Sequence, residues 1–361
     1  MDKQLKFFFD FLRFCIGSDK EIPDSLKEAD WKELYAIAQK QSLVGILFDG
    51  IKKLPAEHVG MKKELLLQWM AESQMLEKAN VRLNDAVIQV SEWFRKKGFR
   101  TCILKGQGNT LMYPNPYSRT PGDIDIWVEG GDKRVISFVR SVSPHEKACY
   151  HHIEFPSYKG VEVEVHYRPS FLLCFWHNRK LQKYYERVKK EQFSHRVMLG
   201  EQGEIAIPTV EFNLIFQLTH IYAHLMNEGI GLRQLVDYYY VLISDDLLLI
   251  RDRVQKELKE LGLWKFASAI MYIMQEMFGM PASRLIVPPN EKYGMFVLNE
   301  VLEAGNFGRH DARNQFGRSQ LGHNLQRVYR DIRLVRYFPA EALCEPLFRI
   351  WHFFWRMKNK I

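Results

Sequence analysis

The chain has 361 residues, and 51 Lys and Arg against 43 Asp and Glu give it a formal net charge of +8. With 47% hydrophobic and 26% charged residues, its composition is that of a globular protein and excludes a disordered tail, a collagen and a membrane bundle. Because a single hydrophobic core stops growing near about 250–300 residues, the length predicts at least two packed units. The positive charge favours an anionic partner without choosing among nucleotide, nucleic acid and membrane.

The cysteines and the apolar segments indicate a cytoplasmic location. Five cysteines are scattered along the chain without a CxxC pair, which is typical of a protein in a reducing compartment. The run Phe7 to Phe9 is interrupted by Asp10 and Arg13, so it does not resemble a secretion signal. No stretch approaches the roughly 20 apolar residues of a membrane span.

Residues 1–97 are predicted to be an N-terminal helical region. Apolar residues recur every three or four positions from Trp31 onward, and Asp30 with Glu33 has the spacing of a helix capping box. Residues 61–97 contain neither Pro nor Gly, which predicts one long helix or two joined end to end.

Residues 98–208 are predicted to be an α+β core. A short apolar strand at 99–104 runs into the glycine turn Lys105–Gly108, and the alternation at 123–128 predicts a second strand. Further elements are a helix at 132–140 and a hairpin of strands 150–155 and 161–167, joined by 156–160.

Residues 209–361 return to helical periodicity and are predicted to form a C-terminal helical domain. The predicted helices are 210–227, 231–244, 246–261, 263–279 and 289–304, with more after Ser319.

Three carboxylates in the middle segment suggest a metal site. On a strand, residues two apart point to the same side, so Asp123 and Asp125 project together. The same alternation puts Glu162, Glu164 and His166 on one face, and pairing of the two strands would bring Glu164 to the aspartates. Such oxygen ligands suit Mg²⁺ or Mn²⁺. The alternative is a solvated sheet face.

The glycine turn adds a candidate phosphate site. In Lys105-Gly106-Gln107-Gly108, the glycines would allow backbone N–H groups to approach a phosphate closely, although such turns are common. With the carboxylates, the turn predicts metal-dependent phosphoryl or nucleotidyl transfer. Since like charges repel, removal of Asp125 is expected to leave the melting temperature unchanged or raised.

An ordered series of motifs resembles the uncharacterised nucleotidyltransferase family of the polymerase-β-like superfamily. The central part of the series is Leu104-Lys-Gly106, Tyr113-Pro114, Arg119, Asp123 to Val128 and Val163 to Arg168. The resemblance also covers Trp31 to Leu54, the late motif Gly305 to Gly308, and His220, His224, Gly229, Leu232, Arg233 and Asp237. The turn departs from the superfamily pattern, which usually has Gly-Ser or Gly-Gly where this chain has Gly106-Gln107.

The resemblance implies transfer of a nucleoside monophosphate from an NTP to an acceptor, with pyrophosphate leaving. By carry-over, Asp123 and Asp125 would hold two Mg²⁺ or Mn²⁺ ions, and Glu164 would complete one ion's shell and help to activate the acceptor hydroxyl. The nucleotide-binding residues would be Lys105, Gly106, Gln107, Gly108 and Arg119. Lys105 and Arg119 would neutralise triphosphate charge, or they are surface cations paired with nearby acids.

Other motifs leave two readings open. His220 and His224 have a spacing that can bind zinc, or they pack between the helical domain and the core. Arg233 and Asp237 form a helix pair, or Asp237 orients Arg233 toward substrate. The aromatic residues at 348–355 touch a membrane or pack in a core or interface. A basic segment binds an anionic acceptor, or it is a solvated face; its arginines are Arg309, Arg313, Arg318, Arg327, Arg330, Arg333 and Arg336.

The predicted architecture is therefore α+β: a nucleotidyltransferase-type mixed sheet flanked by N-terminal helices and a C-terminal helical bundle. The predicted function is metal-dependent nucleotidyl transfer from an NTP to a small-molecule or protein hydroxyl. The alternatives are a non-catalytic nucleotide- or RNA-binding regulator and a phosphotransferase that uses the same carboxylates. The acceptor, the base and the oligomeric state have no signature in the sequence.

Overall fold

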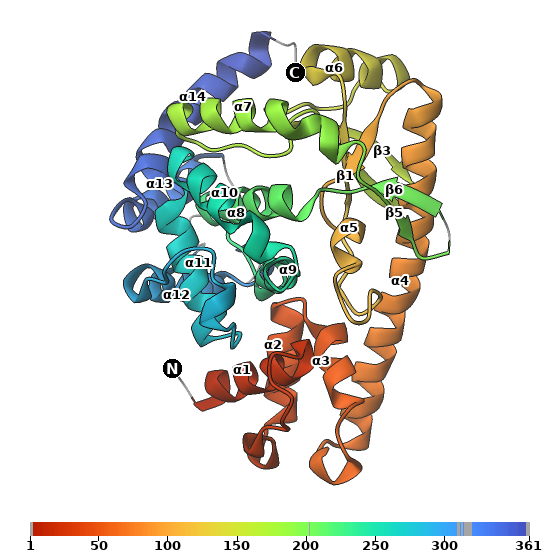
Figure 1. Cartoon of the computed structure of the whole chain (residues 1–361), viewed down its shortest axis with the longest axis vertical. Helices are drawn as coiled ribbons and strands as arrows, with labels where there is room; N and C mark the ends of the chain where they lie inside the picture. The colour runs from red at the N-terminus through yellow and green to blue at the C-terminus, as the bar shows by residue number, and fades with distance from the viewer. Residues whose placement is uncertain (1–2, 202, 309–310, 312, 314–319, 359–361) are drawn as a thin grey trace.

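The computed structural model describes residues 3–201, 203–308, 311, 313 and 320–358. The predicted α+β class is confirmed: a small mixed sheet lies beside a large group of C-terminal helices, and a smaller group of N-terminal helices lies at the bottom of the view (Figure 1). Among the described residues, no helix is long and apolar enough to cross a membrane.

The N-terminal region is helical, as predicted. It contains α1 (Lys3–Ile16), α2 (Trp31–Lys40), α3 (Val44–Ile51) and the 3₁₀ helices Asp24–Glu28 and Ala56–His58. Asp30 caps α2, since its side chain accepts hydrogen bonds from the backbone N–H groups of Lys32 and Glu33.

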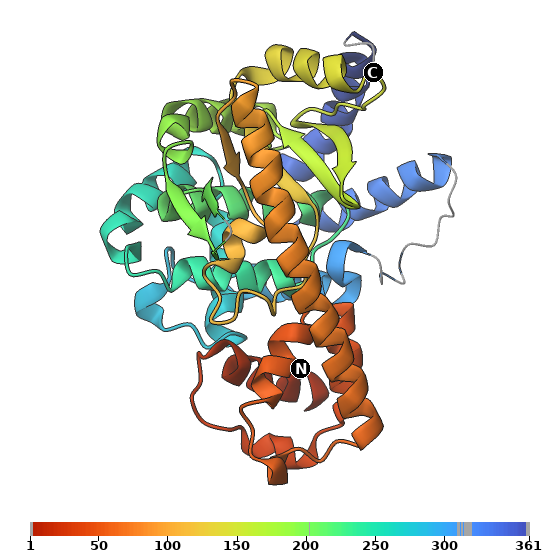
Figure 2. The ribbon, with the colours of Figure 1, turned by 90° about the vertical axis from the view of Figure 1, so that its right-hand side faces the viewer.

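One long helix, α4 (Lys63–Lys96), connects this region to the sheet, in agreement with the predicted span. It runs from the N-terminal helices along one side of the sheet (Figures 1 and 2). Its first half packs with α2 and α3 through Trp69, whereas Leu83 to Phe94 pack against the sheet. The helix therefore holds the two regions together.

The central sheet has four strands in the order β1-β2-β4-β3. The elements in chain order are β1 (Thr101–Ile103), α5 (Gln107–Thr110), β2 (Ile124–Val128), α6 (Gly131–Val142), β3 (His152–Tyr158) and β4 (Val161–His166). Strands β2 and β4 are parallel, and the other two pairs are antiparallel.

The predicted loop at 156–160 is wrong, because β3 continues to Tyr158 and the turn contains only Lys159 and Gly160. Both turn residues have positive φ, as tight hairpins require. The register shifts between Phe155 and Tyr158, where Pro156 cannot donate a backbone hydrogen bond. A strand with such an irregularity reads as a loop in the sequence.

Three further elements of the core, one helix and two strands, were not predicted. Helix α7 (Phe175–Gln192) follows β4, and β5 (Arg196–Leu199) pairs with β6 (Gly203–Ala206) in a separate two-stranded sheet.

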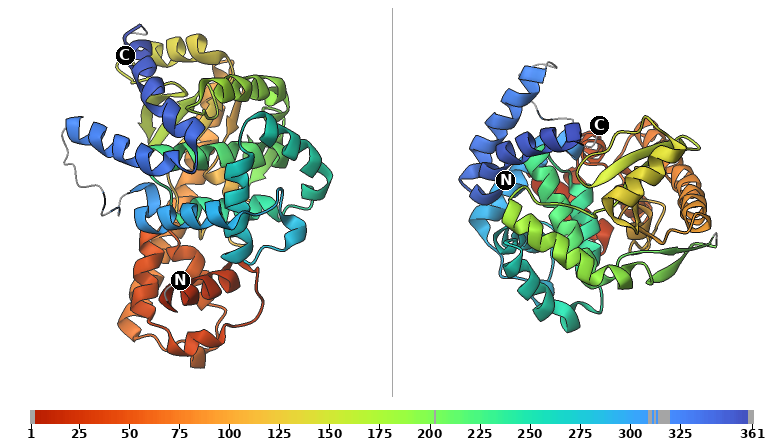
Figure 3. Two further views of the ribbon diagram at one scale, coloured as in Figure 1. Left: turned by 90° about the vertical axis from the view of Figure 1, so that its left-hand side faces the viewer. Right: turned by 90° about the horizontal axis from the view of Figure 1, so that it is seen from above.

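The C-terminal part is helical at all the predicted windows. Its elements are α8 (Val210–Asn227), α9 (Leu232–Leu242), α10 (Leu247–Glu260), α11 (Trp264–Glu276), α12 (Glu291–Ala304), α13 (Gln320–Val335) and α14 (Pro339–Lys358), with 3₁₀ turns at Ala282–Arg284 and Asn306–Gly308. Figure 3 shows α13 projecting from the body and α14 turning back across it. Phe348 and Trp351 of α14 pack on Phe175 of α7.

Two hydrophobic cores lie on opposite faces of the sheet. Ile124, Ile126 and Val128 enter a core with α4 and α6, whereas Trp127 enters a second core with Phe212 of α8. The second core draws residues from the segments 1–97, 98–208 and 209–361, so those domain boundaries stay a prediction. Asp125 alternates with Ile124 and Ile126 and therefore faces the C-terminal helices.

Candidate active site

The register of the sheet brings the three predicted carboxylates together. Asp125 on β2 lies directly opposite Glu164 on the parallel strand β4, and Asp123 directly precedes β2. One carboxylate oxygen from each of Asp123, Asp125 and Glu164 lies within 4.8 Å of the others. The strand pairing on which the sequence argument depended is therefore present.

Two cations stabilise this acidic cluster. Lys105 Nζ lies 3.0 Å from Asp125 Oδ2 and 3.9 Å from Asp123 Oδ1. His166 Nε2 lies 3.0 Å from Asp125 Oδ1 and 3.4 Å from Glu164 Oε2. The side chain of Asp125 is 1% exposed, so its charge depends on these partners.

The pKa values follow from this pairing. Burial would lower the pKa of His166, but its hydrogen bonds to Asp125 and Glu164 outweigh burial and raise it to about 10. Burial would raise the pKa of Asp125, but the charge of Lys105 and the hydrogen bond and charge of His166 together outweigh burial and lower it. The expectation that removing Asp125 would not destabilise the protein is therefore reversed, because Lys105 and His166 would lose a buried anion.

The carboxylates also fit a divalent cation. Oδ2 of Asp125 is buried, and its close polar neighbour is Lys105 Nζ at 3.0 Å. Because a carboxylate oxygen has two lone pairs, one remains for a ligand bond. Oxygen donors on two neighbouring strands are the set that Mg²⁺ or Mn²⁺ prefers.

Of the residues predicted to bind phosphate in the glycine turn, only some lie near the carboxylates. Gly106 precedes α5 with φ 60° and ψ −112°, and Lys105 points to the aspartates. The Gln107 side chain is buried and donates to Asn84. A Cβ at Gly108 would lie 3.1 Å from the carbonyl oxygen of Ile103, so Gly108 serves close packing.

Replacing Gly106 with alanine should destabilise the turn. This backbone conformation is open only to glycine, and forcing an L-residue into it costs about 1–3 kcal/mol. We expect urea denaturation to show a loss of that size. Gly60→Ala is the control, because φ at Gly60 is ordinary and its added Cβ would meet only Trp31 Nε1, at 3.8 Å. Equal stability of the two variants would contradict the assigned strain.

The structure places Arg119 in a buried ion pair. Its Nε and Nη2 each lie 2.8 Å from an oxygen of Asp237, which also accepts a hydrogen bond from the Tyr113 hydroxyl. Arg119 lines neither of the cavities described below. The predicted pairing of Arg233 with Asp237 on α9 stays a prediction; Arg233 Nη1 donates to the Thr120 carbonyl at 2.9 Å.

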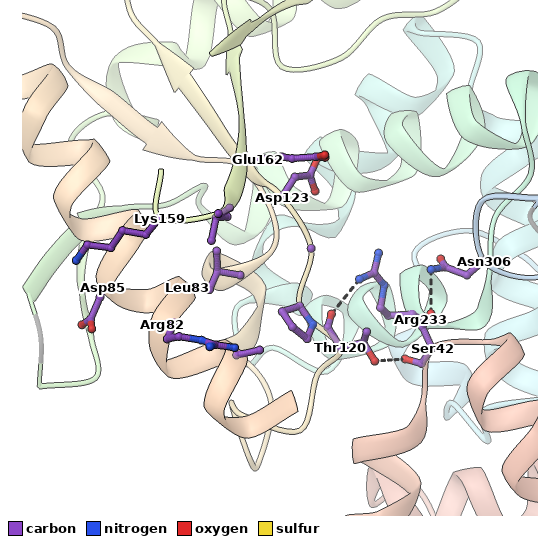
Figure 4. A pocket seen from close by; sticks show the side chains of 15 residues that line it. Ser42, Arg82, Leu83, Asp85, Thr120, Asp123, Lys159, Glu162, Arg233 and Asn306 are labelled. Carbon is purple, nitrogen blue, oxygen red and sulfur yellow. Dashed lines mark hydrogen bonds between the residues drawn. The ribbon is translucent and has the colours of Figure 1, made fainter. Parts of the chain in front are cut away.

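Two cavities meet at Asp123. The larger, of about 840 Å³, lies between α4, the β3–β4 turn and α9; we call it the Arg233 cavity. Figure 4 shows one wall of this cavity. There Arg233 donates a hydrogen bond to Thr120, and Thr120 and Asn306 each donate one to Ser42. Asp123 and Glu162 lie at its other end, and Arg82 and Lys159 also line it.

The smaller cavity, of about 440 Å³, contains all three carboxylates and Lys105. We call it the histidine cavity, because six histidines line it: His151, His152, His166, His220, His224 and His352. Helices α8, α13 and α14 close it from the C-terminal side.

The sequence argument missed His151, His152 and His352. Burial lowers the pKa of His151 to about 3 and that of His352 to about 4, so both are neutral at pH 7. A consecutive His-His pair at the start of a strand is the one signal that the sequence offered. The rings of His220 and His224 lie 4.2 Å apart and line the same cavity, which agrees with their placement between the helical domain and the core.

The basic segment is partly paired with acids. Arg313 and Arg333 both contact Glu300, and Arg330 is buried. Arg327 lines the histidine cavity 4.0 Å from Glu345. Arg309 and Arg318 lie outside the described residues.

Comparison with known proteins identifies the class. The family described as uncharacterised nucleotidyltransferases matches residues 27–279, and the chain belongs to this family. The match includes the three carboxylates, Lys105 and α8 but ends before α12 to α14.

Among solved structures, an antigenic nucleotidyltransferase-like protein from Paracoccidioides brasiliensis is similar at 12% identity and a TM-score of 0.33. The alignment covers 61% of this chain and 97% of that one. No curated protein matches.

Proposed function

We propose that the protein transfers a nucleoside monophosphate from an NTP to an acceptor hydroxyl, with a divalent cation as cofactor. The observation that carries the proposal is the pairing of Asp125 with Glu164 across parallel strands, with Asp123 beside them. Membership of the nucleotidyltransferase family supports the same chemistry.

In this reaction the acceptor oxygen bonds to the α-phosphorus, and the bond from that phosphorus to the bridging oxygen breaks to release pyrophosphate. Asp123, Asp125 and Glu164 would hold Mg²⁺ or Mn²⁺, which when bound stabilises charge on the attacking and leaving oxygens. In this proposal Glu164 would accept the hydroxyl proton, and Lys105 Nζ, 3.0 Å from Asp125 Oδ2, would supply positive charge for phosphate oxygens.

The two cavities provide separate approaches to Asp123. The Arg233 cavity has the larger volume, and its cations Arg82, Lys159 and Arg233 are balanced by the acids Asp85, Asp123 and Glu162. We assign the nucleotide to this cavity on its volume. The histidine cavity then takes the acceptor. Its far wall comes from α13 and α14, outside the region shared with the family, so the acceptor would be specific to this chain and its nearer relatives.

The alternative of a non-catalytic nucleotide- or RNA-binding regulator relies on the basic segment. Its support is reduced by the pairing of Arg313 and Arg333 with Glu300. The phosphotransferase alternative uses the same carboxylates and differs in its product, which would be a nucleoside diphosphate.

A thermal-shift screen tests the proposal. A ligand that binds only the native state at 100 times its dissociation constant adds about 2.7 kcal/mol of stability. We expect one or more NTPs to raise the melting temperature only when Mg²⁺ or Mn²⁺ is also present. A shift with polyanions alone, equal with and without metal, would contradict the proposal and favour the regulator.

A further inference from the structure

We propose that His152, Glu164 and His166 form a binding site for a transition-metal ion of the Zn²⁺ class. The site shares Glu164 with the all-oxygen site of Asp123, Asp125 and Glu164, but its other two donors are imidazole nitrogens. Metal binding at these residues does not depend on nucleotidyl transfer, so the inference goes beyond the proposed function.

The strand register places the three donors on one face of the sheet. His152 on β3 lies directly opposite His166 on the antiparallel strand β4, and Glu164 precedes His166 by two residues. Directly opposed residues of an antiparallel pair point to the same side. The intervening Val163 and Val165 are buried in the core on the other face. The backbone therefore fixes which side chains converge.

The distances match those around a bound ion. Nδ1 of His152 and Nε2 of His166 each lie 3.4 Å from Oε2 of Glu164. In a tetrahedral zinc site with bonds of about 2.0–2.1 Å, neighbouring donor atoms lie roughly 3.3 Å apart. Both imidazole nitrogens are thus at ligand spacing from the carboxylate oxygen, and all three donors lie within 4.8 Å of one another. Asp125 Oδ1, 3.0 Å from His166 Nε2, is a candidate fourth donor.

The surroundings support ligation through Nε2 of His166. Its other ring nitrogen, Nδ1, lies 3.4 Å from the backbone carbonyl oxygen of Arg168. A carbonyl at this position favours a proton on Nδ1, which is the usual support for a metal-bound histidine. An ion that binds Nε2 would displace the proton that this nitrogen shares with Asp125 and Glu164. His152 and Glu164 are accessible from the cavity, since their side chains are 17% and 32% exposed.

The donor chemistry separates the two sites. Imidazole suits Zn²⁺ and its neighbours in the first transition row, whereas Mg²⁺ prefers carboxylate and water oxygens. One face of the sheet would then hold a hard cation near Asp123 and a softer one near His152. A second group, Cys149, His151 and His152, also has donor atoms within 4.8 Å of one another, so the test must tell the two groups apart.

Isothermal titration of the chelator-treated full-length protein with ZnCl₂, and separately with MgCl₂, tests the site. We expect His152→Ala and His166→Gln each to weaken Zn²⁺ binding at least tenfold. We expect His152→Ala to leave Mg²⁺ affinity unchanged. Asp123→Asn should weaken Mg²⁺ binding and leave Zn²⁺ affinity unchanged, since Asp123 belongs only to the oxygen site. His145→Ala is the matched control, because His145 is exposed and lies outside both cavities.

A cobalt titration decides between the neighbouring groups, since thiolate ligation gives Co²⁺ a near-ultraviolet charge-transfer band that nitrogen and oxygen ligands do not. We expect visible bands of tetrahedral Co²⁺ without that band, and no change with Cys149→Ser. Unaltered Zn²⁺ affinity in His152→Ala and His166→Gln would overturn the proposal, as would a thiolate band lost in Cys149→Ser. If circular dichroism shows that His152→Ala is unfolded, His152→Gln takes its place. These readouts do not use NTP, so they separate this inference from the proposed function.

Discussion

Replacing Asp125 with asparagine should lower metal-dependent pyrophosphate release by at least about 1,000-fold, or about 4 kcal/mol of transition-state stabilisation. Asp125 is the central member of the cluster, since it is buried, lies opposite Glu164 and contacts both Lys105 and His166. An amide cannot supply the negative charge that the cation requires. The measurement is continuous pyrophosphate detection with each NTP in Mg²⁺ or Mn²⁺.

The matched control for this prediction is Glu154→Gln. Glu154 is an exposed carboxylate on β3, directly opposite Glu164, and it lies outside both cavities. Its loss changes the charge of the same sheet face by the same amount, and we expect activity to be retained. Equal turnover by the Asp125→Asn variant and the wild type would contradict a role of the carboxylates in the reaction.

Asp125→Asn should also be less stable than the wild type, by about 1.5–3 kcal/mol, because a buried charged hydrogen bond is lost. Urea denaturation without added metal measures this difference.

Asp237→Asn should lower the free energy of unfolding by about 3–5 kcal/mol, the usual cost of removing one partner from a buried ion pair. The side chains of Arg119 and Asp237 are 4% and 6% exposed, and two guanidinium nitrogens contact the carboxylate. The variant leaves the Arg119 charge buried without its anion. The shift of the urea midpoint reports the loss.

Two further variants make this prediction specific. Arg119→Met combined with Asp237→Leu should recover much of the lost stability, because apolar replacement of both partners is often neutral. Glu28→Gln should leave the urea midpoint nearly unchanged, because the Lys3–Glu28 pair is exposed. Equal losses in Asp237→Asn and Glu28→Gln would contradict the structural role of the buried pair. Loss of the NTP-dependent thermal shift in the folded double variant would instead assign Arg119 to the nucleotide.

Much of the fold follows from local periodicity. The α4 span and the C-terminal helices have apolar residues at helical spacing, and the Asp30 cap is encoded within four residues. Short elements with weak patterns were not predicted, as the β5–β6 pair of four-residue strands shows. The end of β3 was misread because Pro156 ends the alternation before the strand itself ends.

The site was only partly predictable, because its parts come from distant segments. Two-residue spacing showed which carboxylates share a face, but only strand pairing places Asp125 beside Glu164. Arg119 and Asp237 are 118 residues apart, and no local pattern links them. The same holds for His352, which reaches the cavity from α14.

The most direct test of the proposed chemistry traces where the α-phosphate and the γ-phosphate of the NTP go. Protein, Mg²⁺ or Mn²⁺ and a mixture of candidate acceptors are incubated with NTP labelled either in the α-phosphate or in the γ-phosphate. We predict that the α-label enters product and the γ-label leaves in pyrophosphate, with Glu154→Gln active and Asp125→Asn inactive. Transfer of the γ-label with release of nucleoside diphosphate would contradict nucleotidyl transfer and establish a phosphotransferase.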